Sequence, residues 1–208
     1  MKKISSRTDN YTSMKLGILA LQGDFREHKS VIQNLGASTV LVKRPDHLGG
    51  LDGLVIPGGE STAIAKLMEK WGLFELIKEK VAGGLPVFGT CAGLILMAKD
   101  LEDGPPTLGL MDIEVERNAY GRQIESFEGE LETTEKEEFR GNSVHGVFIR
   151  APQVKRVGPE VKVLAEHEQL PVLLREDRLL AATFHPELTD DPGVHDYFLR
   201  RVVRGSED

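Results

Sequence analysis

The stretch KLGILALQGDFREHKSVIQNLGASTVLV (residues 15–42) is the part of the sequence that decides the fold. Its apolar start, Lys15 to Leu21, predicts a buried strand, and Phe25 to Leu35 predicts a helix that ends at Gly36. A second strand is expected at Thr39 to Val42. A strand, a helix and a further strand in this order are typical of a parallel sheet with helices packed on its faces.

The same alternation continues through the first half of the chain. Further strands are expected at Gly53 to Ile56 and at Leu85 to Phe88. Apolar residues recur at helical spacing between Glu60 and Val81, with a break at Trp71-Gly72, and another helix is expected from Cys91 to Ala98. The pattern predicts an α/β fold with a mixed, mostly parallel central sheet covered by helices.

The second half of the chain is richer in strands and turns. The region from Met111 to Phe184, which ends with the apolar run Leu179 to Phe184, predicts antiparallel additions to the sheet. Asp191 to Arg204 predicts a closing helix with one apolar face. A chain of 208 residues fits one domain of ordinary size. We expect residues 1–13 to be a flexible N-terminal extension and residues 14–208 to form the domain.

The composition excludes several classes of protein. A formal net charge of -7 argues against binding to nucleic acid, which requires clustered Lys and Arg. No apolar run approaches the roughly 18 to 20 residues that span a bilayer, and the N-terminus lacks the apolar core of a signal peptide. The single cysteine excludes an internal disulfide and a multi-thiolate metal site. We therefore expect a cytoplasmic protein without a nucleic-acid or membrane partner.

The lone cysteine lies in the motif Gly89-Thr90-Cys91-Ala92-Gly93, where a strand gives way to a helix. Glycines on both sides permit a sharp turn and close packing of the helix on the strand, which leaves the sulfur exposed at the carboxyl edge of the sheet. The first turn of a helix also favours a thiolate over a thiol. The pattern predicts a nucleophile; the alternative is a small buried apolar residue.

A second motif, His185-Pro186-Glu187, follows the last apolar run. In extended backbone, residues two apart point to the same side, so His185 and Glu187 are expected to face one site, with Glu187 bonded to one ring nitrogen and the thiol near the other. A nucleophile, a base and an orienting carboxylate are the parts that thiol catalysis requires. The alternative is a surface histidine beside a solvated carboxylate.

A third motif, Pro57-Gly58-Gly59-Glu60-Ser61-Thr62, also joins a strand to a helix. Backbone N–H groups in such a turn can stabilise an oxyanion, and Glu60 and Ser61 offer polar contacts to a small substrate. The alternative is an ordinary loop that ends in a helix cap made by Ser61 or Thr62.

Together these motifs resemble the triad-type (class I) glutamine amidotransferases, and within them the family of glutaminase subunits of pyridoxal 5'-phosphate synthase. The resemblance covers nearly all of residues 14–204. It is carried by the runs LALQGDFREH (19–28), PGGEST (57–62), GTCAGLI (89–95), LGLMDIEVERNAYGRQIESFEGEL (108–131), VFIRAP (147–152) and FHPELTDD (184–191).

The resemblance implies a three-layer, flavodoxin-like fold and a role for each matching residue. Cys91 would be the nucleophile, His185 the general acid and base, and Glu187 its orienting partner. Arg117 would hold the substrate carboxylate; unaided, it would pass for a solvated hairpin charge, and Arg150 for a charge at the rim. The implied substrate-binding residues are Gly59, Glu60, Ser61, Arg117, Ile149 and Arg150, and the implied oxyanion donors are the N–H groups of Ala92 and of Gly58 or Gly59.

The activity implied by the resemblance is hydrolysis of L-glutamine to L-glutamate and ammonia, with no metal or organic cofactor. The family further implies a separate synthase subunit, a (β/α)8 barrel, that assembles with the glutaminase into a large hetero-oligomer, receives the ammonia internally and activates the glutaminase when it docks. Two alternatives remain from the sequence. One is a glutaminase that serves another synthase, and the other is a non-catalytic, thiol-sensing or scaffold protein of similar fold.

Overall fold

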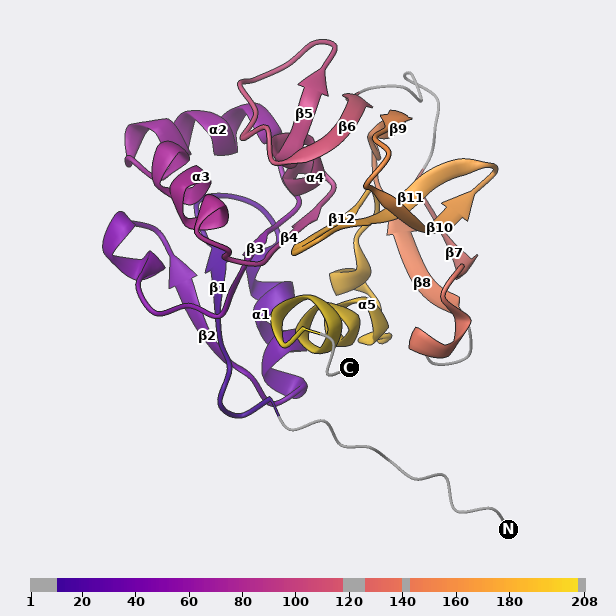
Figure 1. Cartoon of the computed structure of the whole chain (residues 1–208), viewed down its shortest axis with the longest axis horizontal. Coiled ribbons are helices and arrows are strands. Elements are labelled where there is room, and N and C mark those ends of the chain that lie inside the picture. The colour runs from indigo at the N-terminus through magenta and orange to yellow at the C-terminus, as the bar shows by residue number, and fades with distance from the viewer. Residues whose placement is uncertain (1–10, 118–125, 140–142, 206–208) are drawn as a thin grey trace.

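A seven-stranded mixed sheet forms the centre of the structure, a computed structural model that describes residues 11–117, 126–139 and 143–205 (Figure 1). Its strands, from one edge to the other, are β10 (Lys162–His167), β11 (Leu170–Glu176), β12 (Leu179–Ala182), β4 (Val87–Thr90), β3 (Gly53–Ile56), β1 (Lys15–Leu19) and β2 (Ser38–Val42). The five from β12 to β2 are parallel, and β11 and β10 extend the sheet antiparallel. The predicted fold class is confirmed.

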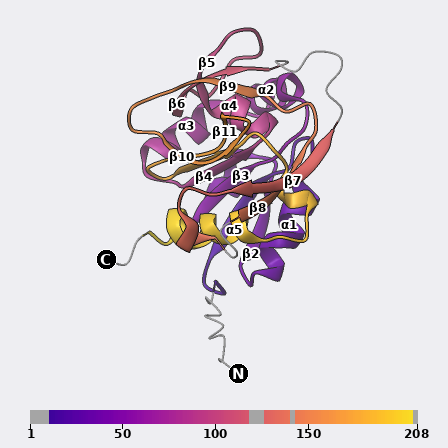
Figure 2. The same ribbon diagram turned by 90° about the vertical axis from the view of Figure 1, so that its right-hand side faces the viewer.

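Helices cover both faces of this sheet, as Figure 2 shows. They are α1 (Phe25–Asn34), α2 (Ser61–Lys70), α3 (Phe74–Ala82), α4 (Ala92–Met97) and α5 (Gly193–Tyr197), the last continued by a π-helical segment, Phe198–Val203. Alternate strand residues pack on opposite faces. In β3, Leu54 and Ile56 belong to the core beneath α2, α3 and α4, whereas Val55 belongs to the core beneath α1 and α5.

Two smaller sheets flank the central one. A three-stranded sheet contains β5 (Ala98–Leu101), β6 (Met111–Glu116) and β9 (Gln153–Val157), and a hairpin contains β7 (Phe127–Glu132) and β8 (Ser143–Phe148). Short 3-10 turns lie at Pro45–Leu48, Lys136–Glu138 and Pro186–Leu188. The expectation of a strand-rich second half is confirmed, although most of its strands form these separate sheets.

The boundary expected for the N-terminal extension needs a correction at Tyr11. Only 2% of Tyr11 is exposed, and its hydroxyl donates a hydrogen bond to Asp196 Oδ1 at 2.7 Å. Tyr11 therefore belongs to the core between the sheet and the last helix. Burial of its large apolar ring stabilises the fold, and the hydroxyl keeps a hydrogen-bond partner. The expected extension overlaps the domain at this point, and residues 1–10 lie outside the described residues.

The closing helix is shorter and less regular than expected. The first residues from Asp191 form a turn, in which Asp191 Oδ1 accepts a hydrogen bond from the Gly193 N–H at 2.8 Å, and α5 then passes into the π-helical segment. None of the helices in the described ranges is long and apolar enough to cross a membrane.

Candidate active site

The carboxyl ends of β1, β3, β4 and β12 meet at one edge of the sheet, and the segments that follow them carry the candidate residues. Cys91 follows β4, and His185 lies three residues beyond the end of β12. The Gly58-Gly59 turn follows β3. In an open parallel sheet this edge is where ligands bind, because the loops of neighbouring strands converge there.

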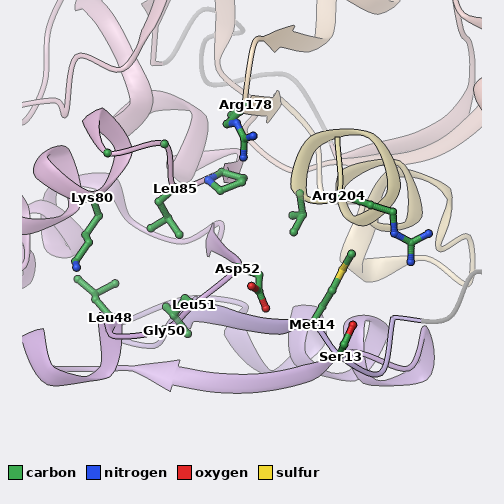
Figure 3. Close-up of a pocket in the computed structure, with 14 residues that line it drawn as sticks. Ser13, Met14, Leu48, Gly50, Leu51, Asp52, Lys80, Leu85, Arg178 and Arg204 are labelled. Carbon is green, nitrogen blue, oxygen red and sulfur yellow. The ribbon is translucent and has the colours of Figure 1, made fainter. Parts of the chain in front are cut away.

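The opposite edge of the sheet holds a groove of about 600 Å³ (Figure 3). Its lining comes from residues at or just before the starts of the same strands, among them Met14, Asp52, Leu85 and Arg178. None of the predicted site residues lines it, so the groove is separate from the candidate active site.

Cys91 occupies a strained turn between β4 and α4. Its backbone has φ 47° and ψ -101°, a conformation that non-glycine residues rarely adopt. The Cys91 N–H donates to Ala182 O at 2.8 Å, and Cys91 O accepts from the Ile95 N–H at 3.2 Å. A Cβ on Gly93 would lie 2.0 Å from Ile56 O, so only glycine lets α4 approach β3 this closely. The predicted nucleophile turn is therefore present.

The prediction that the sulfur is exposed is wrong. Only 7% of Cys91 is accessible. The Cys91 side chain interacts with the ring of His185 and contributes to raising the pKa of that imidazole. A buried thiol paired with an imidazole differs from the inert apolar cysteine that was the alternative.

His185 and Glu187 meet as predicted, but in a different backbone conformation. The His185 Nδ1 atom lies 2.8 Å from Glu187 Oε1, and both side chains are buried. The expectation of extended backbone is wrong, because Pro186–Leu188 forms a 3-10 turn. Proline is well suited to the first position of such a turn. The tight turn brings Glu187 back under the imidazole.

The surroundings favour a charged imidazole beside a carboxylate. Burial alone would lower the pKa of His185, but hydrogen bonds to Cys91 and Glu187 and the negative charges of both raise it to about 10. For Glu187, burial raises the pKa, yet the interactions with His28 and His185 bring it well below its ordinary value. The site can therefore hold an imidazolium beside the ionised Glu187 carboxylate.

The turn after β3 closes over His185. A Cβ on Gly58 would lie 2.3 Å from His185 Cε1, and Gly59 has φ 149°, which favours glycine. The Gly58 N–H donates to Thr90 Oγ1 at 3.1 Å, so in this conformation it is not available to an oxyanion. The N–H groups of Gly59 and Ala92 make no hydrogen bond within the described part of the chain.

Glu60, rather than Ser61 or Thr62, caps the helix that follows the turn. Its carboxylate accepts from the N–H groups of Thr62 at 3.0 Å and Ala63 at 2.7 Å, while Ser61 is buried. Burial raises the pKa of Glu60, but these bonds and the charge of Arg117 lower it overall. The loop therefore does end in a helix cap, as the alternative predicted, but the cap is made by Glu60 and not by Ser61 or Thr62.

Arg117 reaches the same turn from the end of β6. Its Nη2 atom lies 3.3 Å from Glu60 Oε1, and 24% of its side chain is exposed, so it is an ion-pair partner rather than a solvated hairpin charge. The guanidinium and the carboxylate form a polar pair beside the glycine turn. This pair could bind the two charged groups of a free amino acid.

Ile149 and Arg150 lie next to the His185 segment. They follow β8, and the Val147 O of that strand accepts a hydrogen bond from the His185 N–H at 2.8 Å. Ile149 is 37% exposed, and Arg150 is exposed with φ 46°. The structure thus brings this pair to the histidine side of the site, while Arg117 lies on the glycine-turn side.

Sequence reasoning assigned no role to several polar residues that surround the triad. Asp24 Oδ2 lies 3.5 Å from His185 Nδ1, and the buried His28 lies with Nε2 3.4 Å from Glu187 Oε1. Burial raises the pKa of Asp24. The available signal was the polar pair Asp24 and His28, spaced four residues apart at the start of the first helix.

One group of described residues could hold a metal ion, namely Asp24, His185 and Glu187. Two of these residues, His185 and Glu187, already belong to the candidate triad, and Nδ1 of His185 is bonded to Glu187 at 2.8 Å. A cation here would have to break that bond and compete with a charged imidazole. Catalysis without a metal or organic cofactor stays a prediction.

Comparisons with known proteins match most of the chain. Residues 18–204 match the SNO glutamine amidotransferase family. The chain is 49% identical over 193 residues to pyridoxal 5'-phosphate synthase subunit PdxT of Carboxydothermus hydrogenoformans, covering 92% of this chain and all of the relative. It is 52% identical over 197 residues to PdxT of Pelotomaculum thermopropionicum, covering 93% of this chain and 98% of that one.

A crystal structure of a glutamine amidotransferase matches with a TM-score of 0.83 and 50% identity, covering 88% of this chain and 96% of the other. These similarities agree with the flavodoxin-like sheet order and with the motifs around Cys91 and His185. They confirm the resemblance that the sequence motifs indicated. The chain belongs to the SNO glutamine amidotransferase family.

Proposed function

We propose that this chain hydrolyses L-glutamine to L-glutamate and ammonia through Cys91, His185 and Glu187, and supplies the ammonia to a pyridoxal 5'-phosphate synthase subunit. The observation that carries the proposal is the bond of His185 Nδ1 to the buried Glu187 at 2.8 Å, on an imidazole that also interacts with the buried Cys91 side chain. A scaffold protein would need the cysteine turn but neither of the other two groups.

The reaction follows from these three groups. The Cys91 thiolate attacks the side-chain carboxamide carbon, and a C–S bond forms as the carbonyl oxygen gains negative charge. His185 then gives its proton to the leaving nitrogen, the C–N bond breaks and ammonia departs. Water, deprotonated by the now neutral His185, attacks the γ-glutamyl thioester, the C–S bond breaks and glutamate is released. Glu187 keeps the imidazole oriented in both steps.

The substrate is held by groups on both sides of the triad. Arg117 binds the α-carboxylate of glutamine and Glu60 its α-ammonium, while Gly59, Ser61, Ile149 and Arg150 complete the walls of the pocket. The 3.3 Å contact of Arg117 with Glu60 supports this assignment, because a zwitterion can insert between two opposite charges that are already adjacent.

The oxyanion is stabilised by the N–H groups of Ala92 and of the Gly58-Gly59 turn. The bond from the Gly58 N–H to Thr90 Oγ1 supports a turn that must rearrange before Gly58 can take part. Docking of the synthase subunit, a (β/α)8 barrel in a large hetero-oligomer, provides that rearrangement and couples glutamine hydrolysis to use of the ammonia. We propose a cytoplasmic location, because a free reactive thiol requires a reducing compartment.

The test is glutamate release from glutamine by the purified chain, with and without the synthase subunit of the same organism. Cys91→Ala and His185→Asn are expected to abolish release, and His47→Asn, a change in the Pro45–Leu48 turn, is the control that should leave it unchanged. Absence of Cys91-dependent release in both conditions would refute the glutaminase.

The synthase partner is tested separately. With the barrel subunit and its sugar phosphate substrates, the wild-type chain should support pyridoxal 5'-phosphate formation from glutamine, whereas Cys91→Ala should support it only from added ammonium. Glutamine hydrolysis that is stimulated by a different synthase, and not by this one, would favour the alternative partner.

A further inference from the structure

A chain of buried polar side chains continues from the triad into the core between α1 and α5. Glu187 has no exposed side-chain surface and lies between two imidazoles, with Oε1 2.8 Å from His185 Nδ1 and 3.4 Å from His28 Nε2. His28, on α1, is fully buried. Its Nδ1 atom lies 2.9 Å from Nε2 of His195, on α5, which is also fully buried.

The same histidine is also connected to the nucleophile turn. His28 Nε2 lies 3.1 Å from Thr90 Oγ1, the hydroxyl that accepts from the Gly58 N–H and precedes Cys91 in the chain. One imidazole edge therefore contacts the carboxylate of the triad and the residue next to the nucleophile. Glu187 and Thr90 belong to different segments, and among the described residues His28 is the side chain that has polar contacts to both.

Packing alone does not require histidine at this place. The neighbours of the two rings are aromatic, with Phe88 in edge-on contact with His28 at 6.0 Å and with His195 at 5.6 Å between centroids. Burying an imidazole in such surroundings costs free energy unless its nitrogens are bonded, so apolar residues would stabilise this core more. The ordinary alternative is a pair of core histidines whose only role is to satisfy each other's hydrogen-bonding groups.

The hydrogen-bond pattern fixes the position of the protons. Glu187 Oε1 can only accept while ionised, so Nε2 of His28 carries a proton. Burial lowers the pKa of His195 to about 3, so His195 is neutral. If His195 donates from Nε2 to Nδ1 of His28, its own Nδ1 is a bare acceptor, which agrees with the absence of a described partner at that atom. In the reverse arrangement a buried N–H would be left unpaired.

We infer that His28 is a positioning residue for the triad: its Nε2–H holds the Glu187 carboxylate and the Thr90 hydroxyl in place, and His195 fixes the His28 tautomer from behind. This inference rests on the proposed glutaminase function of the triad. His28 acts through Glu187 and Thr90, since Glu187 and the backbone of Thr90 separate it from the thiol. Its loss should therefore slow the chemical step without weakening glutamine binding.

Two substitutions at His28 separate positioning from packing. In His28→Gln the amide nitrogen lies near the place of Nε2 and keeps a donor toward Glu187 and Thr90. In His28→Asn the amide nitrogen lies near the place of Nδ1, so that donor is lost. Both replacements are polar, unbranched at Cβ and smaller than histidine, which makes them a matched pair.

The expected result is a kcat for glutamate release that is roughly 10- to 100-fold lower in His28→Asn, with KM nearly unchanged, because displacement of the triad by a fraction of an ångström has an effect of this order. His28→Gln should recover most of the lost kcat. The rate of Cys91 alkylation by iodoacetamide, measured without glutamine, should likewise be lower in His28→Asn than in the wild type, and His28→Gln should recover most of it. Equal kcat values and equal alkylation rates in wild type and His28→Asn would overturn the inference.

The alkylation assay also separates this inference from the glutaminase proposal. If the wild type releases no Cys91-dependent glutamate, the glutaminase proposal fails, while a difference in alkylation between the two variants still supports positioning. If His28→Asn does not fold, His195→Phe serves instead: it removes only the N–H behind His28, and a kcat equal to wild type in the folded variant overturns the inference. A kcat that falls equally in His28→Gln and His28→Asn indicates packing and also overturns it.

Discussion

Replacing Glu187 with glutamine gives a sharp test of the triad, because the structure fixes what the amide would meet. Glu187 Oε1 is the atom that contacts both His185 Nδ1, at 2.8 Å, and His28 Nε2, at 3.4 Å. The second oxygen, Oε2, is buried and makes no hydrogen bond to a described residue. If the amide oxygen replaces Oε1, the NH2 group lies where Oε2 was and has nothing to donate to.

The magnitudes follow from these contacts. An unpaired buried donor costs about 1–3 kcal/mol, which lowers the free energy of unfolding by that amount. A hydrogen bond to a charged group contributes about 1.5–3 kcal/mol, so loss of the negative charge that orients and stabilises the His185 imidazolium should lower kcat roughly 10- to 150-fold. The KM for glutamine should change little, since Glu187 is buried behind His185.

The assay is steady-state glutamate release by the complex with the synthase subunit, together with chemical denaturation of the isolated chain. Thr189→Ala, a change in the turn that follows Leu188, is the control: it removes a hydroxyl bond to Pro186 O at 3.0 Å without altering charge at the triad. If Glu187→Gln has the kcat of the wild type, then neither orientation nor charge is supplied by Glu187, and the assignment of the triad is wrong.

Three further predictions follow from individual contacts. Gly93→Ala should abolish glutamate release and lower the melting temperature, because its Cβ would lie 2.0 Å from the Ile56 carbonyl oxygen and the backbone would have to move; an unchanged melting temperature would contradict this. The free energy of unfolding should fall as pH rises from about 7 to 10: His185 has its pKa raised from 6.5 to about 10, so the folded protein keeps a proton that the unfolded chain loses. Denaturation at several pH values should show this slope, and the slope should be smaller in Glu187→Gln. Arg117→Lys should raise the KM for glutamine more than it lowers kcat, because an ammonium lacks the two-pronged geometry that the guanidinium offers to a carboxylate; equal effects on both constants would refute a pure binding role.

The parts of the fold that depend on local pattern could be predicted from the sequence. The strand at Gly53–Ile56 has the expected bounds, and the break at Trp71-Gly72 separates α2 from α3. Short apolar runs and glycines carry these signals within a few residues of one another. The nucleophile turn was predictable for the same reason. Gly93 is required because β3 lies close to it, and the alternation of strands and helices in the sequence already predicted the position of β3.

Features that depend on contacts distant in the sequence could not be predicted in this way. Tyr11 is buried, and its hydroxyl donates a hydrogen bond to Asp196, which is 185 residues away. His28 and His195 meet only because α1 and α5 pack on the same face of the sheet (Figure 2). A histidine at the buried position of one helix resembles any other core residue until its partner is known. The 3-10 turn at Pro186–Leu188 shows the same limit, because Pro186 permits both an extended segment and a first turn.

The pairing of β4 with β12 has a consequence for the motions of the site. Ala182 lies opposite Thr90 in this parallel ladder, and its carbonyl accepts the Cys91 amide at 2.8 Å. The segments that bear the nucleophile and the base are thus tied by main-chain bonds in the middle of the sheet, where opening requires disruption of the whole core. Amide hydrogen exchange at Cys91 should accordingly be as slow as global unfolding. Surrounding loops can fluctuate, admit substrate or change during evolution while the distance between the two reacting groups persists for as long as the sheet itself.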